Sequence, residues 1–315
     1  MSGSHLFPKL VVVGATGWYG KTFVYEYAIA YGLKAACENL LLFASRSSTL
    51  CLKIAGSILK LPVFDLAEAP NCSLAAFDGL LWYSFILKNK LPVIGCQEYR
   101  RVNQSIAEHV FSCLNKNLHL HVTFFSSGDA LDAASSCNFD LNPYAFLKNK
   151  YELELANYGP FVTLYPYATL GKFIVEQHLF AASSFLYQAI LTGRIEIRSK
   201  FPVVRSYGSV HDFSKLLLRL YEIKDWQVQS LPSKIVPVTH TLDLFQLAHE
   251  VSASLGKSCP IISNFDPDST PSVYTATDYS YGAQLSRFGV KSTDLRQQLI
   301  DMASGDAFQM SANNT

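Results

Sequence analysis

The sequence predicts an α/β fold, because apolar runs of strand length alternate with helical stretches through its first half. Runs rich in Val, Leu and Phe are typical of parallel strands that are buried on both faces. A glycine-rich turn, Gly14–Gly20, joins the first such run to the first helical stretch. Together these observations predict a Rossmann-like doubly wound parallel sheet over residues 1–165, followed by a smaller, mixed C-terminal substrate lobe.

The elements are expected in a regular order up to Tyr165 and an irregular one after it. Strands are predicted at 9–13, 40–44, 59–64, 79–86, 121–125 and 161–165, with helices at 19–30, 98–114 and 143–157. Helices at 171–191, 210–222 and 241–255 and a strand at 194–198 make up most of the lobe over 166–303, with some return to the sheet. The polar stretch 304–315 is predicted to be a disordered tail.

Composition narrows the class of partner. Of the 315 residues, 49% are hydrophobic and 16% are charged, and the net charge is +1, which argues against binding nucleic acid through bulk charge. No apolar run approaches the roughly 20 residues that a helix needs to cross a membrane. The 7 cysteines are odd in number and irregularly spaced, which is typical of reduced thiols. We therefore expect a cytoplasmic protein that binds a small molecule.

The strongest local signal is the glycine turn itself, with its spacing Gly-x-x-Gly-x-x-Gly. Glycines between a strand and a helix allow a tight turn and close approach of a pyrophosphate to the free N–H groups of the helix. This context predicts a dinucleotide site. Its expected cofactor-binding residues are Gly14, Thr16, Gly17, Trp18, Tyr19 and Gly20.

The end of the second strand bears on which dinucleotide is bound. It reads Ser45-Arg46-Ser47 and carries no acid to hold ribose hydroxyls, whereas a guanidinium suits a 2′-phosphate. NADP(H) is therefore favoured over NAD(H), unless Arg46 is simply solvated. Asp65 and Leu66, after the third predicted strand, are further expected cofactor-binding residues, and Asp65 either accepts a bond from the adenine or caps a helix. Tyr83 and Ser84, after the fourth strand, are expected to line the cofactor channel.

A second constellation suggests acid–base chemistry. Tyr144 and Lys148 are four residues apart, so they share one face of the predicted helix. A nearby ammonium lowers the pKa of a phenol, which is otherwise roughly 10. Ser127 follows the fifth predicted strand, at the end where ligands bind in such sheets. Ser127, Tyr144 and Lys148 are therefore the predicted catalytic residues.

These motifs, in this order, resemble the extended short-chain dehydrogenase/reductase family of sugar-nucleotide epimerases, dehydratases and reductases. The resemblance implies that Tyr144 exchanges a proton with the substrate, Lys148 holds the nicotinamide ribose and Ser127 bonds the reacting oxygen. It also implies a structural role for Asn103 and a substrate-diphosphate role for Arg205, whose alternative is a surface ion pair. Glu152 follows Lys148 as it often does in the family.

Several departures from the family pattern stand out. Tyr165-Pro-Tyr-Ala168 replaces an Arg-Pro-x-Asn run, which removes a familiar substrate contact at Ala168. Gly128 stands where dehydratases of the family carry an acid, so 4,6-dehydration is not expected. Asp129 alone remains there, as a candidate substrate contact or a solvated residue. The pair His119 and His121 lacks a third ligand nearby, and no metal site is predicted.

The sequence thus favours an NADPH-dependent reductase of a nucleoside-diphosphate-linked keto-(deoxy)sugar, with Tyr144 as general acid. One alternative is an NAD-dependent sugar-nucleotide epimerase, which recycles its cofactor. Another is a non-catalytic NADP-binding sensor or scaffold. The family resemblance further implies a homodimer.

Overall fold

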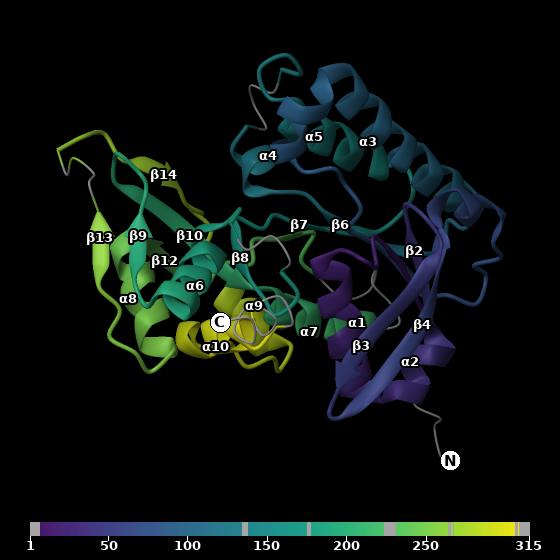
Figure 1. Cartoon of the computed structure of the whole chain (residues 1–315). Helices are drawn as coiled ribbons and strands as arrows, with labels where there is room; N and C mark the ends of the chain where they lie inside the picture. Colours follow the sequence, from purple (N-terminus) through teal and green to yellow (C-terminus); the bar gives the residue numbers. More distant parts are fainter. Residues whose placement is uncertain are drawn as a thin grey trace. The chain divides into compact units, whose positions relative to one another are not determined.

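The computed structural model describes residues 7–133, 138–174, 178–223, 231–263, 266, 268–305 and 308, and the chain divides into two compact units (Figure 1). Unit 1 comprises Met1–Tyr165 and Ser214–Ile235. Unit 2 comprises Pro166–Phe213 and Val236–Thr315. Each unit has its own sheet and its own buried core, and each is described separately below.

Unit 1 is built on an eight-stranded sheet, which confirms the predicted α/β class and its Rossmann-like parallel sheet. Its strands are β1 (Leu10–Val13), β2 (Leu40–Ala44), β3 (Ser48–Ile54), β4 (Ser57–Asp65), β5 (Gly79–Trp82), β6 (His121–Phe125), β7 (Phe161–Leu164) and β11 (Lys234–Ile235). They run in the order β11-β7-β6-β5-β1-β2-β4-β3, and every neighbouring pair is parallel except β3 with β4. The chain leaves β1 toward β2 on one side and returns to β5 on the other. The carboxyl ends of β1 and β5 therefore flank the point where such sheets bind ligands.

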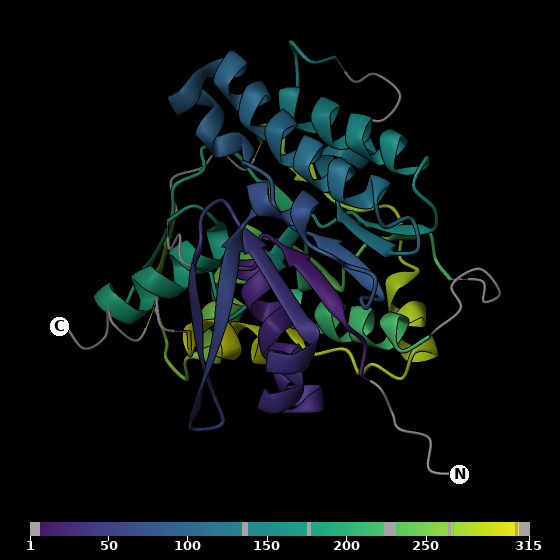
Figure 2. The same ribbon diagram turned by 90° about the vertical axis from the view of Figure 1, so that its right-hand side faces the viewer.

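Helices cover both faces of this sheet (Figure 2). They are α1 (Trp18–Tyr31), α2 (Leu33–Asn39), η1 (Leu66–Asn71), η2 (Lys88–Lys90), α3 (Leu91–Asn115), α4 (Gly128–Asp132), α5 (Pro143–Leu155) and α7 (Val210–Tyr221), the last of which begins in unit 2. Val11 and Val13 of β1 pack in one core with Phe111 of α3 and Tyr151 of α5. The alternate residues of β1 are equally buried, so the strand is apolar throughout, as expected where both faces are covered.

The antiparallel strand β3 was not predicted from the sequence. It forms a hairpin with β4 through Ala55 and Gly56, which both have positive φ, of 48° and 83°. Its buried and exposed residues alternate, which is typical of an edge strand with one covered face. The expected strand 59–64 is confirmed within the longer β4, and β2 and β6 have the predicted bounds.

Unit 2 has a four-stranded and a two-stranded sheet. Its strands are β8 (Ala168–Leu170), β9 (Ile195–Ile197), β10 (Val203–Ser209), β12 (His240–Asp243), β13 (Ile261–Ser263) and β14 (Ser272–Tyr274). Its helices are α6 (Ala181–Thr192), α8 (Leu244–Ser254), α9 (Tyr281–Arg287) and α10 (Leu295–Ala303). The strand β10 pairs with β12 on one side and with β8 and β14 on the other.

Unit 2 contains the predicted helix 171–191 and the predicted tail 304–315. The helix predicted at 171–191 is wrong over its described first part, because β8 precedes it and helical structure begins only at Ala181. Of the predicted tail, the structure describes only Ser304, Gly305 and Phe308, and the other residues lie outside the described part. Phe308 is 1% exposed.

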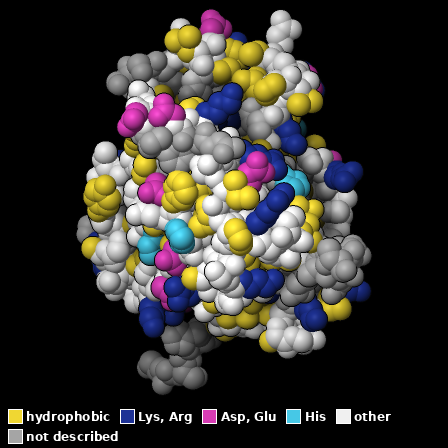
Figure 3. Space-filling view, turned by 60° about the vertical axis from the view of Figure 1, so that its left-hand side comes forward, with side chains coloured by type: hydrophobic (Ala, Val, Ile, Leu, Met, Phe, Trp, Pro, Cys, Tyr) yellow, Lys and Arg dark blue, Asp and Glu magenta, His cyan; other side chains and the backbone are white. Residues whose placement is uncertain are grey.

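The surface shows no dominant charge on the face drawn in Figure 3, where basic and acidic side chains are interspersed with apolar ones. This distribution agrees with the net charge of +1. Within the described residues, no helix is long and apolar enough to span a bilayer. The predicted absence of nucleic-acid binding stays a prediction.

The packing of α7 against β5 and β6 leads to a prediction about Gly79. A Cβ there would lie 2.1 Å from Cε1 of Tyr221 and 2.7 Å from the carbonyl oxygen of His121. We expect Gly79→Ala to lower the free energy of unfolding by about 1–3 kcal/mol, as overpacking does. In the control, Gly282→Ala in α9, the added Cβ meets nothing within 4 Å, so this variant should be neutral or slightly stabilising. Urea unfolding measures both, and an unchanged midpoint for Gly79→Ala would contradict this packing.

Candidate functional site

The turn after β1 is held tightly against the neighbouring strands. The N–H groups of Gly14 and Ala15 both donate to the carbonyl oxygen of Phe43, at 2.8 and 3.1 Å. Gly14 has φ of +94°, and a Cβ there would lie 2.8 Å from the backbone nitrogen of Ser84. Gly14 is therefore required by its left-handed conformation and by the close approach of the segment after β5.

The other two glycines of the turn differ in what limits them. A Cβ on Gly20 would lie 2.4 Å from the carbonyl oxygen of Gly14, so the packing of α1 itself excludes a side chain. A Cβ on Gly17 would meet only that oxygen, at 3.3 Å. Gly17 is exposed at the N-terminus of α1, whose first turn carries no acidic residue. This bare helix end suits an anionic group that approaches the backbone closely.

Aromatic rings pack at the carboxyl ends of β5 and β6. The ring of Tyr83 lies 4.1 Å from that of Phe125 and 6.3 Å from those of Tyr19 and Phe23, measured between centroids. The Tyr83 hydroxyl is buried and has no hydrogen-bond partner among the residues that the structure describes. Because this ring packs against Tyr19 and Phe23 of α1, Tyr83 helps to hold the helix that follows the glycine turn. Ser84 donates its N–H to the carbonyl oxygen of Val13, at 3.1 Å, which fixes it beside Gly14.

Ser127 and Tyr144 meet at the end of β6. Ser127 is the N-cap of α4, and its Oγ accepts a bond from the N–H of Ala130 at 3.2 Å. Burial raises the pKa of Tyr144 to about 12, the neighbouring Ser127 side chain lowers it, and the charge of Asp129 raises it. The phenol is therefore protonated at neutral pH in the ligand-free protein.

Lys148 lies in an aromatic surrounding one turn after Tyr144. The residue is 3% exposed, and its Nζ donates a hydrogen bond to the carbonyl oxygen of Phe125. The same atom is 4.1 Å from the ring centroid of Phe85 and 6.0 Å from that of Tyr144. Burial lowers the pKa of Lys148 to about 7, and the charge of Glu152 opposes this shift.

The structure thus brings the three predicted catalytic residues together in unit 1, at the sheet edge that also carries the glycine turn. Sequence reasoning did not find the aromatic wall around Lys148, made by Phe85 and Phe124. Their only sequence signal is their place at or just after the ends of strands β5 and β6. Nor did the sequence indicate a role for Glu152 or a partner for Tyr165.

Asn103 and Asp129 are both bound to protein groups. Asn103 is completely buried, accepts a bond from the N–H of Ile86 at 2.8 Å and donates to the carbonyl oxygen of Tyr99. Asn103 therefore shapes the segment after β5, as its expected structural role requires. Asp129 forms an ion pair with Lys88.

At the end of β2 the residues expected to select the cofactor lie in a short exposed connection to β3. Ser45, Arg46 and Ser47 are all exposed, and the Oγ of Ser47 accepts a bond from the N–H of Asp65 at 3.1 Å. Asp65 caps η1 by accepting from the N–H of Ala67, which was one of its two predicted roles. In the sheet, Asp65 is paired with Ala44, the last residue of β2. The Leu66 side chain is buried in the core.

Arg205 belongs to unit 2, where it lies on β10. Its guanidinium donates to the carbonyl oxygens of Val204 and Ser272, at 2.9 and 2.8 Å, and to Oγ of Ser272 at 3.0 Å. Arg205 is therefore held by backbone groups rather than by the acidic partner of a surface ion pair.

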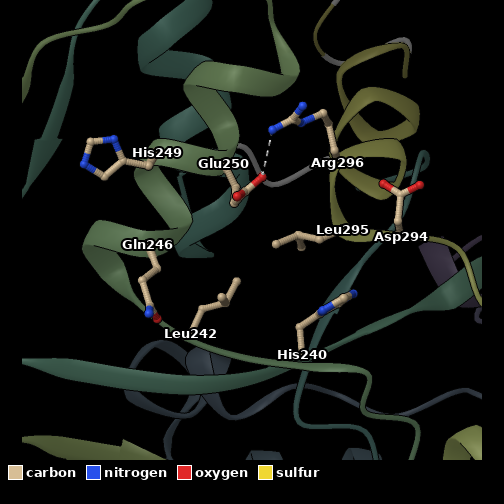
Figure 4. A pocket seen from close by; sticks show the side chains of 8 residues that line it. All are labelled: His240, Leu242, Gln246, His249, Glu250, Asp294, Leu295 and Arg296. Carbon is tan, nitrogen blue, oxygen red and sulfur yellow. Dashed lines mark ion pairs between the residues drawn. The ribbon is translucent and has the colours of Figure 1, made fainter.

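Unit 2 also contains an open pocket of about 820 Å³, which Figure 4 shows from close by. It lies between β12, α8 and α10, and Glu250 and Arg296 form an ion pair across it at 3.7 Å. It is lined by His240, Leu242, Gln246, His249, Glu250, Asp294, Leu295 and Arg296. No residue predicted from the sequence to be functional lines this pocket.

Solved structures share this fold over nearly the whole chain, although no family model and no curated protein matches the sequence. A UDP-glucose 4-epimerase from Stenotrophomonas maltophila, with bound NAD and formylated UDP-arabinopyranose, aligns with a TM-score of 0.72 and 16% identity over 98% of both chains. The fold is that of the extended short-chain dehydrogenase/reductases. The resemblance seen in the sequence is therefore confirmed for the fold.

Two further structures carry related names. A UDP-N-acetylglucosamine 4-epimerase from Methanobrevibacter ruminantium, in complex with UDP-N-acetylmuramic acid, has a TM-score of 0.66 and 17% identity over 96% of this chain and 98% of its own. An NAD-dependent NDP-hexosamine 5,6-dehydratase of tunicamycin biosynthesis has a TM-score of 0.66 and 11% identity over 94% of this chain and 96% of its own.

The predicted preference for NADP(H) is wrong by comparison with these structures. The Stenotrophomonas enzyme holds NAD, and so do other UDP-glucose 4-epimerases of the same fold. The prediction rested on the absence of an acidic residue at the end of β2. In the folded sheet, Asp65 of β4 is paired with Ala44 at that end, and its carboxylate caps η1. Arg46 is an exposed residue of the connection to β3.

The burial of Lys148 predicts a pH-dependent effect on stability. Its pKa is about 7 in the folded protein but roughly 10 when unfolded, so the unfolded chain binds the proton more tightly between these values. Burial of the charged amine therefore lowers the free energy of unfolding by its full amount below about pH 7. This loss of stability disappears as the pH rises toward roughly 10. We expect the stability of Lys148→Met, relative to the parent, to fall across this range.

Urea unfolding at several pH values tests this expectation. The control is Lys150→Met, which removes an exposed lysine from the same helix. A difference between Lys148→Met and the parent that stays constant with pH would contradict the burial of a titrating amine.

Proposed function

We propose that this protein is an NAD-dependent epimerase of a nucleoside-diphosphate sugar. The observation that carries the proposal is that Ser127 and Tyr144 are neighbours, with the buried amine of Lys148 one helical turn away. These groups stand at the end of β6, in the same unit as the glycine turn after β1. A protonated phenol and a second hydroxyl suit proton exchange with a sugar hydroxyl or carbonyl oxygen.

The residues at the carboxyl edge of the sheet fit a dinucleotide. Gly17 and the N-terminal N–H groups of α1 would hold its diphosphate, because no side chain or acidic residue obstructs the approach. Asp65 would hold the adenosine part, and Lys148 the ribose next to the nicotinamide. When bound, NAD supplies a reversible hydride acceptor.

The chain's own groups would manage the proton. Tyr144 would take the proton of the sugar hydroxyl and return it, and Ser127 would hold the same oxygen through a second hydrogen bond. Tyr144 has a pKa of about 12 in the ligand-free protein, too high for a base at neutral pH. The ammonium form of Lys148 favours the tyrosinate and so lowers that pKa.

The substrate class is supported by the similar structures, which bind or act on nucleotide sugars. The substrate-diphosphate role of Arg205, in unit 2, stays a prediction. Asp129 would contact the sugar while Lys88 neutralises it. Formation of a homodimer and a cytoplasmic location stay predictions.

An epimerase is favoured over the other enzymes of this fold for two reasons. The similar structures that hold NAD argue against a net reductase that consumes NADPH. Gly128 provides no acid next to Ser127, which disfavours a dehydratase of the family pattern. A non-catalytic sensor is disfavoured because it has no use for the Ser127–Tyr144 pair.

Replacement of Tyr144 by phenylalanine tests turnover directly. We expect Tyr144→Phe to slow interconversion of UDP-glucose or UDP-N-acetylglucosamine with its 4-epimer by about 10²–10⁴-fold, because only the proton-exchanging hydroxyl is lost. Binding of NAD, measured by calorimetry, should change little. The control is Tyr158→Phe, just beyond α5, which should leave the rate unchanged. Equal rates for Tyr144→Phe and the parent would contradict an acid–base role.

The expected roles of the exposed Gly17 and the buried Gly20 can be separated. Gly17→Ala should keep the parent's melting temperature but weaken NAD binding at least about tenfold, since the new methyl group stands where the diphosphate approaches. Gly20→Ala should lower the melting temperature, because its Cβ would clash with Gly14. NAD affinity that is identical in Gly17→Ala and the parent would place the dinucleotide elsewhere.

A further inference from the structure

Lys148 has few groups that can support its positive charge. Its side chain is removed from water, and its Nζ donates a hydrogen bond to the carbonyl oxygen of Phe125. The rings of Phe85 and Phe124 lie 4.1 and 5.1 Å from Nζ. Ring faces and one carbonyl dipole replace the water shell of an ammonium only in part, so a formal negative charge nearby has a large effect.

Glu152 supplies that charge from the next turn of α5. Residues four apart on a helix lie on the same face, and Glu152 is the carboxylate that acts on Lys148. Glu152 is itself only partly exposed. The hydroxyl of Tyr165, just after β7, donates a hydrogen bond to its Oε1. This bond ties the carboxylate to the residue that follows β7, and the four-residue spacing puts it on the same face of α5 as Lys148.

The partner of Glu152 is neutral in this chain. Burial raises the pKa of Tyr165, so its phenol is uncharged. The charged groups that face Glu152 are Lys148 on its own helix and Lys234 on β11, whose Nζ lies 5.6 Å from the Tyr165 ring. A phenol orients a carboxylate without neutralising it, which leaves more of the negative charge to act on Lys148.

We propose that Glu152, oriented by Tyr165, is a positioning residue that keeps the amine of Lys148 protonated for its role beside Tyr144. The inference rests on the proposed function for that role, but the charge coupling itself is a property of the ligand-free protein. It assigns Glu152 an action through Lys148 and no contact with the substrate or with NAD.

The direction of the effect follows from the charges. Burial lowers the pKa of Lys148 to about 7, and Glu152 opposes that shift. Burial also raises the pKa of Glu152, while the bond from Tyr165 and the charges of Lys234 and Lys148 lower it. Removing the carboxylate should therefore lower the pKa of Lys148 further, so that less of the amine is protonated at neutral pH.

The experiment follows the titration of Lys148 by NMR in the full chain labelled with ¹³C-lysine, without NAD or substrate. The Lys148 signal is the one lost in Lys148→Arg. We expect Glu152→Gln, which keeps the shape of the side chain, to lower the titration midpoint by about one pH unit. The matched control, Glu154→Gln, removes a carboxylate two residues later on the same helix and should leave the midpoint unchanged.

The outcomes separate this inference from the proposed function. An unchanged midpoint in Glu152→Gln, or an equal shift in Glu154→Gln, overturns the inference whether or not the protein turns over nucleotide sugars. A shifted midpoint together with a protein that binds no NAD leaves the charge coupling standing and overturns the proposed function. If Glu152→Gln does not fold, Glu152→Asp is titrated instead. Its withdrawn carboxylate should lower the midpoint by a smaller amount, and no change there again overturns the inference.

Discussion

The burial of the Lys148 amine is the constraint on which the candidate site depends. An amine without water must be held by fixed dipoles and charges or release its proton. Here the carbonyl oxygen of Phe125 and the ring of Phe85 surround Nζ, and Glu152 acts from the next turn. Helix α5 must therefore keep its place over the end of β6. Tyr144 lies on the same helix, which places its phenol near Ser127.

The glycine turn shows how one motif divides its work between folding and binding. Gly14 and Gly20 are excluded from carrying side chains by Ser84 and by the turn itself. Gly17 meets no comparable obstacle, so its small size is free to serve a ligand. This division follows from parallel topology, because β1 and β5 are adjacent in the sheet although α1, β2 and the β3–β4 hairpin lie between them in sequence.

The comparison with NAD-bound structures shows the limit of a cofactor rule based on one strand. A carboxylate near the ribose can come from any strand that ends at the same edge. The sequence at Ser45-Arg46-Ser47 indicated a phosphate-binding arginine, yet Asp65 from β4 lies beside the end of β2. Strand β3 leads the chain away from that edge and the parallel strand β4 returns it, and no local pattern near Arg46 indicated this pairing.

The sequence by itself determined the fold class and the bounds of β2 and β6, because period along one strand or helix is a local property. It also pointed to Ser127, Tyr144 and Lys148, which the fold brings near one another and whose catalytic role stays a prediction. Tertiary structure decided the rest. The antiparallel pairing of β3, the late start of α6 and the aromatic wall around Lys148 depend on contacts between residues far apart in the chain. The charge on a buried amine likewise depends on what surrounds it, and only folding assembles those surroundings.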